Sequence, residues 1–512
     1  MNIEKHSVSD NNRRIAKNTL ILYVRMFFVM VVSLFTTREI LNTLGVSDFG
    51  IFNVVGGVVI MMNVINSAMS VSTQRYLTFE LGKNDMLQFR RTFSMCMNIF
   101  LFLSLMLLIL GETIGLWFIN NYLTIPVERM AAANWVYQFA LLSCICSLLM
   151  NPYNATIVAH ERMNVYAYIG IAEVLIKLFI VYMLLIIPFD KLATYGVLTF
   201  LSSFIIFITY RYYCKRNFME SHYVKYWEKK LFKRLLSYSG WNLFGSLSGV
   251  AKGQGLNVLM NLFFGPSVNA SRGIAYQING VVHSFFSNFY TAVRPQITKY
   301  YAQGDLVSMY KLVFLSSRMS FFLILIVSLP LITETPFIIR LWLGQMPEYV
   351  VPFIRIIIVI TAIDSMSTPL MTAIHATGNN RLYQLSVGII MIMTLPISYL
   401  FLRFGYSPVS VFIVSLILSV LSLFVRLRIA QKQTGISFGM YINQVVLRSF
   451  IVGTIACLLP LAIHSLMREG WLCTIFICIV STICCIGSAY YIGLNHDEKL
   501  FVLKTIKNAI KK

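Results

Sequence analysis

Charged residues are scarce in this sequence, and acidic residues are the scarcest of all. Asp, Glu, Lys and Arg together make up 12% of the 512 residues, whereas 57% are hydrophobic and the mean hydropathy is +0.72. A typical soluble globular protein has about 25% charged residues, so this composition excludes one. It indicates a chain that lies mostly within a lipid bilayer.

Several motifs of enzyme chemistry are also missing. The sequence contains no GxxxxGK[ST] phosphate-binding loop and no DxD motif, so neither a P-loop ATPase nor a membrane glycosyltransferase is indicated. We therefore expect no enzyme and no bound cofactor, with work driven by an H⁺ or Na⁺ gradient or by the membrane potential. The nine cysteines lie in or beside apolar runs and form no CxxC pair. They are interpreted as small core residues, and no metal site is expected.

Long apolar segments account for most of the chain. A lipid core about 30 Å thick needs about 20 apolar residues per helix. Fourteen segments fit: 18–37, 46–72, 92–112, 132–152, 166–187, 195–213, 237–263, 272–293, 311–333, 350–371, 385–402, 408–426, 446–467 and 471–493. The sequence thus predicts an all-α polytopic membrane protein with about 14 transmembrane helices.

The loops predict the orientation. Of the 42 Lys and Arg residues, 30 lie on the side of the N-terminus, 7 on the other side and 5 within spans. Because cytosolic loops carry the excess of Lys and Arg, both termini are expected in the cytosol. The cytosolic parts are the tails 1–17 and 494–512 and the basic linker 214–236. The linker suggests an interfacial helix on anionic lipid or a partner-docking site, and nucleic acid is not needed to explain the charge.

An internal repeat appears when the chain is shifted against itself by about 220 residues. The matches are Leu44-Gly45 with Phe264-Gly265 and Gly82–Asp85 with Ala302–Asp305 at 220, and Pro152, Ile157, Ala159 and Tyr166 with Pro369, Ile374, Ala376 and Tyr383 at 217. Six spans in each copy predict two parallel lobes, 18–213 and 237–426, related by an axis along the membrane normal. Two further helices follow in 446–493.

Four segments carry a family resemblance: LNTLGVSDFGIF at 41–52, STQRYLTFELGKND at 72–85, NATIVAHERMNVYAY at 154–168 and RPQITKYYAQGD at 294–305. In this order they resemble bacterial polysaccharide or O-antigen flippases of the MATE-like multidrug/oligosaccharidyl-lipid/polysaccharide exporter superfamily. The resemblance implies alternating-access transfer of an undecaprenyl-pyrophosphate-linked oligosaccharide to the outer leaflet. The expected partners are this cargo, membrane lipid and other polysaccharide-assembly proteins, with a monomer as the transport unit. The alternative is a cation-coupled multidrug exporter of the same fold.

Charged residues within the predicted spans are candidates for function, because burying charge in lipid is costly. Away from the span ends they are Arg25, Glu173, Lys177, Lys252, Arg318, Arg355 and Asp364. Five cations against two acids favour an anionic cargo over a cationic drug. Glu173 and Lys177, four residues apart on one helix, are expected to form a structural ion pair. Arg25, Arg318 and Arg355 are candidates for diphosphate binding, or for side chains that extend to the lipid headgroups.

Lys252 lies about 15 residues into its span, too deep to reach the headgroups easily. It belongs to a run in which Gly245, Gly249 and Gly253 recur every fourth residue. Such spacing favours either a flexible, gating helix that lines a cavity, with Lys252 binding an anionic group, or a tight packing seam with the lysine facing water.

Polar side chains add to these candidates. Asn53, Asn63, Asn279 and His283 lie on polar stripes of the first helices of each lobe, suited to binding sugar hydroxyls or to joining helices by hydrogen bonds. For His283 a satisfied polar group is favoured over a proton relay. Resemblance to lipid II flippases implies that Asp48 forms an outer gate, and a helix N-cap is the alternative.

Overall fold

The chain folds into helices throughout the part that the structure describes. The computed structural model describes residues 2–60, 63–122, 125–344, 346–467, 469–496, 498 and 499, without the side chains of 2–13, 34, 37, 38, 41, 46, 47, 53, 54, 56–60, 63 and 122. Eleven of its helices are long enough and apolar enough to cross a membrane. The prediction of an all-α polytopic fold is confirmed.

Two compact units divide the chain. One comprises Lys17–Ser246, and the other Leu247–Lys512 together with Met1–Ala16. The division falls inside a single long helix, α8, and between Gly245 and Gly249 of the glycine run.

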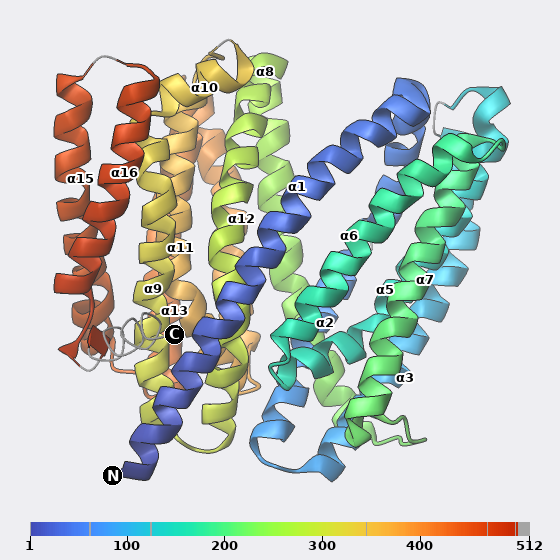
Figure 1. The fold of residues 1–512 in the computed structure, drawn as a ribbon, viewed down its shortest axis with the longest axis horizontal. Helices are drawn as coiled ribbons and strands as arrows, with labels where there is room; N and C mark the ends of the chain where they lie inside the picture. Colours follow the sequence, from blue (N-terminus) through green and yellow to red (C-terminus); the bar gives the residue numbers. More distant parts are fainter. Residues whose placement is uncertain are drawn as a thin grey trace. The chain divides into compact units, whose positions relative to one another are not determined.

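The unit Lys17–Ser246 is built from α1 to α7 (Figure 1). The bounds are α1 Asn2–Ile60, α2 Asn63–Gly82, α3 Met86–Leu110, α4 Leu116–Tyr122, α5 Met130–Ala159, α6 Met163–Ile186 and α7 Lys191–Asn217. Helix α5 packs along α7 and also contacts α2 and α3. Fully buried aromatic side chains such as Phe100 and Tyr137 fill the space between α3 and α5, as an apolar interior requires.

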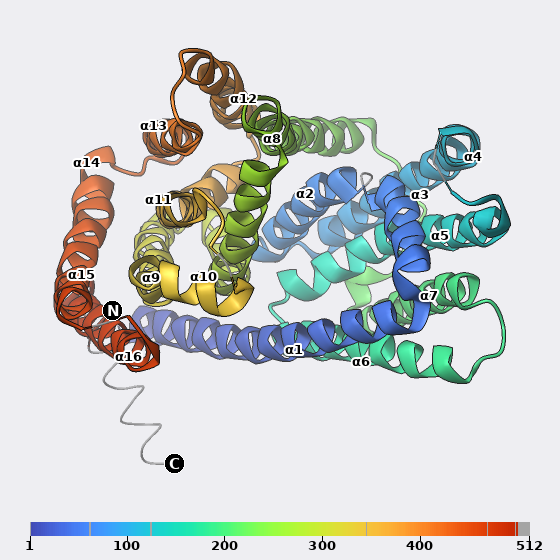
Figure 2. The same ribbon diagram turned by 90° about the horizontal axis from the view of Figure 1, so that it is seen from above.

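The other unit holds the larger set of helices. The bounds are α8 Lys229–Ala302, α9 Leu306–Thr333, α10 Thr335–Leu343, α11 Val350–Ala376, α12 Arg381–Arg403, α13 Val409–Thr434, α14 Phe438–Tyr441, α15 Arg448–Leu466 and α16 Trp471–Ser488. Helix α11 packs against both α9 and α13, whereas α15 and α16 lie side by side against α9, at the edge of this unit (Figure 1, Figure 2).

Three of the predicted spans are not among the eleven apolar helices. The segments 237–263 and 272–293 fall in α8, where Lys252, Gln254, Asn257 and Arg272 lower the hydropathy. The segment 46–72 falls in α1 and α2 and includes residues 61 and 62, which lie outside the described residues. These three segments carry most of the side chains that the sequence analysis selected.

The internal repeat is visible in the backbone. Gly45 and Gly265, 220 residues apart, interrupt α1 and α8 with nearly the same dihedral angles, φ 79° and ψ 167° against φ 77° and ψ −173°. Left-handed residues recur at Asn84 and Gly304, again at a shift of 220, and at Glu161 and Gly378, at a shift of 217. The residue that follows Asn84 and the residue that follows Gly304 each cap a helix. Asp85 accepts a hydrogen bond from Gln88 N, and Asp305 accepts one from Ser308 N. The two units therefore share one succession of turns.

The basic linker is helical at both ends, since residues 214–217 end α7 and 229–236 begin α8. Residues 222–228 between them are non-helical and run along α3, and we call these seven residues the strap. Asn98 of α3 accepts a hydrogen bond from Tyr223 Oη at 2.8 Å and donates one to Tyr226 O at 3.0 Å, while Val224 N donates to Ser94 Oγ at 3.0 Å. Hydrogen bonds to α3 thus replace those that a helix would make within itself.

Candidate substrate cavity

A cavity of about 250 Å³ lies within the unit that contains α8 to α16. Its walls come from α8, α11 and α13. The lining residues are Lys252, Tyr276, Asn279, His283, Phe286, Ile357, Ile360, Thr361, Asp364, Ser365, Thr368, Phe412 and Ser415. Three side chains that the sequence analysis selected, Lys252, Asn279 and His283, therefore share one cavity.

A carboxylate faces these side chains from α11. Asp364 is 46% exposed, and its Oδ1 accepts hydrogen bonds from Ser419 Oγ at 3.1 Å and from Arg426 Nη1 at 3.2 Å. Arg426 is buried and also contacts the hydroxyl of Ser367. In the ion pair Asp364–Arg426, the carboxylate of Asp364 is thus open to the cavity and the guanidinium of Arg426 is buried behind it.

Lys252 has no such partner among the described residues, where it makes neither an ion pair nor a hydrogen bond. The charges of both Asp364 and Arg426 act on it through space. The charged side chains that line the cavity, Lys252 and Asp364, balance each other, and the buried Arg426 behind Asp364 brings the net charge around the cavity to +1. The Lys252 ammonium retains donors that can bind an added anion.

Amide and hydroxyl groups complete the lining. Thr361 Oγ1 donates to Asn279 Oδ1 at 2.6 Å and so joins α11 to α8. Thr368 donates to the backbone of Asp364 at 2.9 Å. Asn279 therefore links two helices while lining the cavity, which combines the two alternatives that its sequence position left open.

The glycine run does not form a tight seam in this unit. A Cβ placed on Gly249 or Gly253 meets no atom within 4 Å, whereas one on Gly255 would lie 2.5 Å from Leu395 Cδ2 of α12. The carbonyl of Gly253 accepts a hydrogen bond from Arg272 Nη2 at 2.7 Å. Close packing thus occurs at Gly255, a position outside the predicted spacing.

The arginines that we expected beside the cavity lie elsewhere. Arg318 is 1% exposed and pairs with Glu498 at 2.5 Å while donating to Gln444 O at 3.1 Å. Arg355 is exposed, and its Nε donates to Ile332 O at 2.9 Å. Neither lines the cavity, and each guanidinium bonds to groups at another place in the fold.

Arg25 lies in the unit Lys17–Ser246. Its guanidinium stacks on the Tyr166 ring, 4.5 Å from the centroid, and occupies the space that the missing side chain of Gly170 leaves on α6. Its Nε is buried without a hydrogen-bond partner in the described part of the chain. On the same helix, Lys177 Nζ and Glu173 Oε1 form an ion pair at 2.7 Å, and both side chains are exposed.

The remaining selected residues lie in the first two helices. Asn53 and Asn63 have side chains outside the described residues. Asp48 pairs with Arg129, whose Nε donates to it at 2.9 Å, and Arg129 Nη1 reaches Asp190 Oδ2 at 2.5 Å. Partial burial alone would raise the pKa of Asp190, but hydrogen bonds from Ala193 N–H and Arg129 hold it below its ordinary value. Asp48 is thus part of an ion-pair cluster with Arg129 and Asp190.

Sequence reasoning missed Arg426 and gave Asp364 no role in the site. Arg426 stands at the end of an apolar span next to Arg428 and Lys432, so the charge count placed it in a cytosolic loop. Only the packing of α11 against α13 shows that its guanidinium reaches back to Asp364.

The fold resembles that of known transporters. A multidrug resistance MATE family transporter of the MOP superfamily, in an outward-facing conformation, matches with a TM-score of 0.70 at 14% identity, over 83% of this chain and 96% of that one. A MATE protein in a bent conformation matches with the same score and identity, over 83% and 97%. A MOP superfamily transporter from Pyrococcus furiosus, described as having a binding pocket of reversed polarity, matches with a TM-score of 0.63 at 14% identity, over 81% and 96%.

These matches establish the fold of MATE-like transporters of the MOP superfamily. No protein-family model matches the sequence, and no curated protein matches it.

Proposed function

We propose that this protein is a membrane transporter that moves an undecaprenyl-pyrophosphate-linked oligosaccharide from the cytosolic to the outer leaflet of the bacterial inner membrane. The observation that supports this proposal is the sign of the charge around the cavity. The carboxylate of Asp364 is already paired with the buried Arg426, whereas Lys252, which lines the cavity, has no ion-pair partner among the described residues. A diphosphate is the part of the cargo that such an excess of cation suits.

The size of the cavity limits what it can enclose. Pockets for drug-sized ligands measure about 300–1,000 Å³, so a cavity of about 250 Å³ suits the diphosphate with its first sugar. Asn279, Thr361 and Thr368 offer amide and hydroxyl groups to sugar hydroxyls. The rest of the oligosaccharide and the lipid chain would lie outside this cavity.

Alternating access requires an element that bends, and α8 has the composition for it. Gly249 and Gly253 have open space where side chains would be, and Lys252 lies between them. A bend at these glycines would carry the Lys252 ammonium with it. Coupling to an H⁺ or Na⁺ gradient or to the membrane potential would act on Asp364, the carboxylate that is open to the cavity.

A cation-coupled multidrug exporter is the second candidate. It is favoured by the half-exposed Asp364 and by the multidrug transporters that share the fold. In that case the Asp364 carboxylate would attract the cationic drug and the Lys252 ammonium would repel it.

Complementation separates the two candidates. The chain would be expressed in a strain that lacks its O-antigen flippase and in a drug-sensitive strain that lacks its exporters, with a C-terminal green fluorescent protein that reports insertion and a cytosolic C-terminus. We expect O-antigen to be restored by the wild type and by Lys252→Arg, but not by Lys252→Ala. The flippase proposal would be overturned if the chain conferred drug resistance that Asp364→Asn abolishes, and did not restore O-antigen in a strain that makes a compatible repeat unit.

A further inference from the structure

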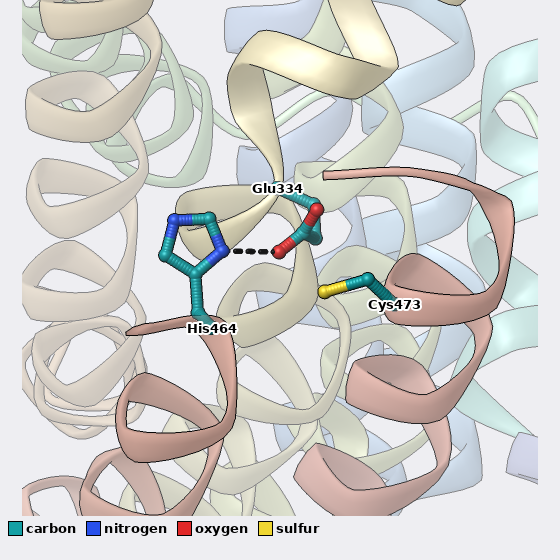
Figure 3. Close-up of side chains that lie close together, drawn as sticks. All are labelled: Glu334, His464 and Cys473. Atoms are coloured by element: carbon teal, nitrogen blue, oxygen red, sulfur yellow. Dashed lines mark hydrogen bonds and ion pairs between the residues drawn. The ribbon is translucent and has the colours of Figure 1, made fainter. Parts of the chain in front are cut away.

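Glu334, His464 and Cys473 converge at one end of the unit that contains α8 to α16. Their side chains come from three different elements and point toward one another (Figure 3). Glu334 lies between α9 and α10, His464 is in the last turn of α15, and Cys473 is in the first turn of α16. One ligand atom of each lies within 4.8 Å of the other two.

We propose that these three side chains bind Zn²⁺ and that the metal fastens the C-terminal helix pair α15–α16 to the α9–α10 corner. A carboxylate oxygen, an imidazole nitrogen and a thiolate are all ligands of Zn²⁺, which tolerates such a mixed set. Hard cations such as Mg²⁺ and Ca²⁺ prefer oxygen ligands, so the thiolate disfavours them.

The distances suit this ion after a small movement. Zn²⁺ takes sulfur at about 2.3 Å and nitrogen or oxygen at about 2.0–2.2 Å, so tetrahedral ligand atoms are about 3.3–3.7 Å apart. His464 Nδ1 and Glu334 Oε1 are now hydrogen-bonded at 2.6 Å. The ion would take the lone pair of Nδ1 while the imidazole keeps its proton on Nε2, and the thiol proton of Cys473 would be released.

Burial and charge also support the site. Glu334 is 0% exposed and Cys473 is 1% exposed, while the side chain of His464 is 31% exposed and leaves an approach open. One carboxylate and one thiolate neutralise Zn²⁺, so the loaded, buried cluster carries no net charge. A water molecule would complete four-fold coordination from the side of His464.

A further hydrogen bond fixes the carboxylate. Thr474 Oγ1 donates to Glu334 Oε2 at 3.2 Å, which leaves Oε1 turned toward His464. Such bonds to the second oxygen of a carboxylate are typical of metal sites, because they orient the ligand. Nearby, Arg340 and Glu469 pair at 3.1 Å and also connect α10 to the segment between α15 and α16.

The experiment uses the purified full-length protein in detergent. The protein is stripped with a chelator, given Zn²⁺ in excess and desalted, and its metal is measured by mass spectrometry. We expect one Zn²⁺ per chain and a higher melting temperature. X-ray absorption at the zinc edge should show one sulfur neighbour at about 2.3 Å with nitrogen or oxygen neighbours.

A matched variant on the same helix provides the control. Cys485 of α16 is as buried as Cys473, at 1% exposure, but does not belong to the cluster. Cys473→Ser should reduce zinc affinity at least tenfold and lose the sulfur signal, whereas Cys485→Ser should keep both. Since a variant can fail to fold, the wild-type spectrum decides by itself. No retained zinc in the wild type, or zinc surrounded only by nitrogen and oxygen, would overturn the proposal.

Discussion

Replacing Lys252 tests whether its charge binds the cargo. Lys252→Met keeps the length and the apolar stem of the side chain and removes only the ammonium. Because Lys252 makes no ion pair or hydrogen bond within the described residues, its loss leaves no partner unsatisfied there. The net charge around the cavity falls from +1 to zero.

The size of the effect follows from the interaction that is lost. A hydrogen bond to a charged group contributes about 1.5–3 kcal/mol, and every 1.4 kcal/mol changes an equilibrium about tenfold. The rate of transport at low cargo concentration should therefore fall about 10- to 150-fold in Lys252→Met. Lys252→Arg keeps the charge and should stay within a few-fold of the wild type.

The assay is transfer of a lipid-linked oligosaccharide across proteoliposomes, followed by the access of an external glycosidase to the sugar. Lys177→Met is the matched control, since this lysine also lies within a span but is exposed and paired with Glu173. If Lys252→Met transports as well as Lys177→Met does, the cation is not used for binding. If Lys252→Arg and Lys252→Met are equally impaired, the shape of the side chain matters and not its charge.

Three further predictions concern stability, measured by thermal unfolding in detergent. Gly170→Val should cost about 1–3 kcal/mol, because its side chain would displace a guanidinium, whereas Gly487→Ala, with nothing within 4 Å, should cost nothing. Hydrogen bonds hold the pKa of Asp190 in the folded protein below its ordinary 3.8, so the ionised carboxylate stabilises the fold. This stabilisation is complete at any pH above the pKa that Asp190 has in the unfolded chain, and it is lost as the pH falls through the pKa of Asp190 in the folded protein. The wild type should exceed Asp190→Asn in stability at pH 7 and should lose this advantage as the pH falls below about 3.8. Glu498→Gln should cost about 3 kcal/mol, because it leaves the Arg318 guanidinium buried without its ion pair, and an unchanged melting temperature would contradict this.

The fold could be predicted from the sequence because the bilayer constrains it. Apolar segments of fixed length must be helices, since lipid offers no partner to a free backbone group. The repeat was detectable because three turns need left-handed or extended residues, such as Gly45 and Gly265, at matching positions. The strap could not be predicted, since its Lys and Trp are compatible with a helix, and its hydrogen bonds to Asn98 are a tertiary property.

The site could be predicted only in part. Lys252, Asn279 and His283 were recognisable because polar groups stand out in an apolar helix, and they share a cavity because they lie on the two halves of α8. The partners of a buried charge cannot be found in this way. Arg318 pairs with a residue 180 positions away and Arg426 with one 62 positions away, so neither pair has a spacing that a sequence pattern could reveal.

The shared turns make the two units comparable residue by residue. A shift of 220 residues places Lys252 in register with Val32, and a shift of 217 places Asp364 and Arg426 in register with Ser147 and Thr209. None of these counterparts is charged. The turns thus recur in both units, whereas the charged residues of the cavity belong to one unit alone, so the repeat extends to the backbone turns and not to the charges.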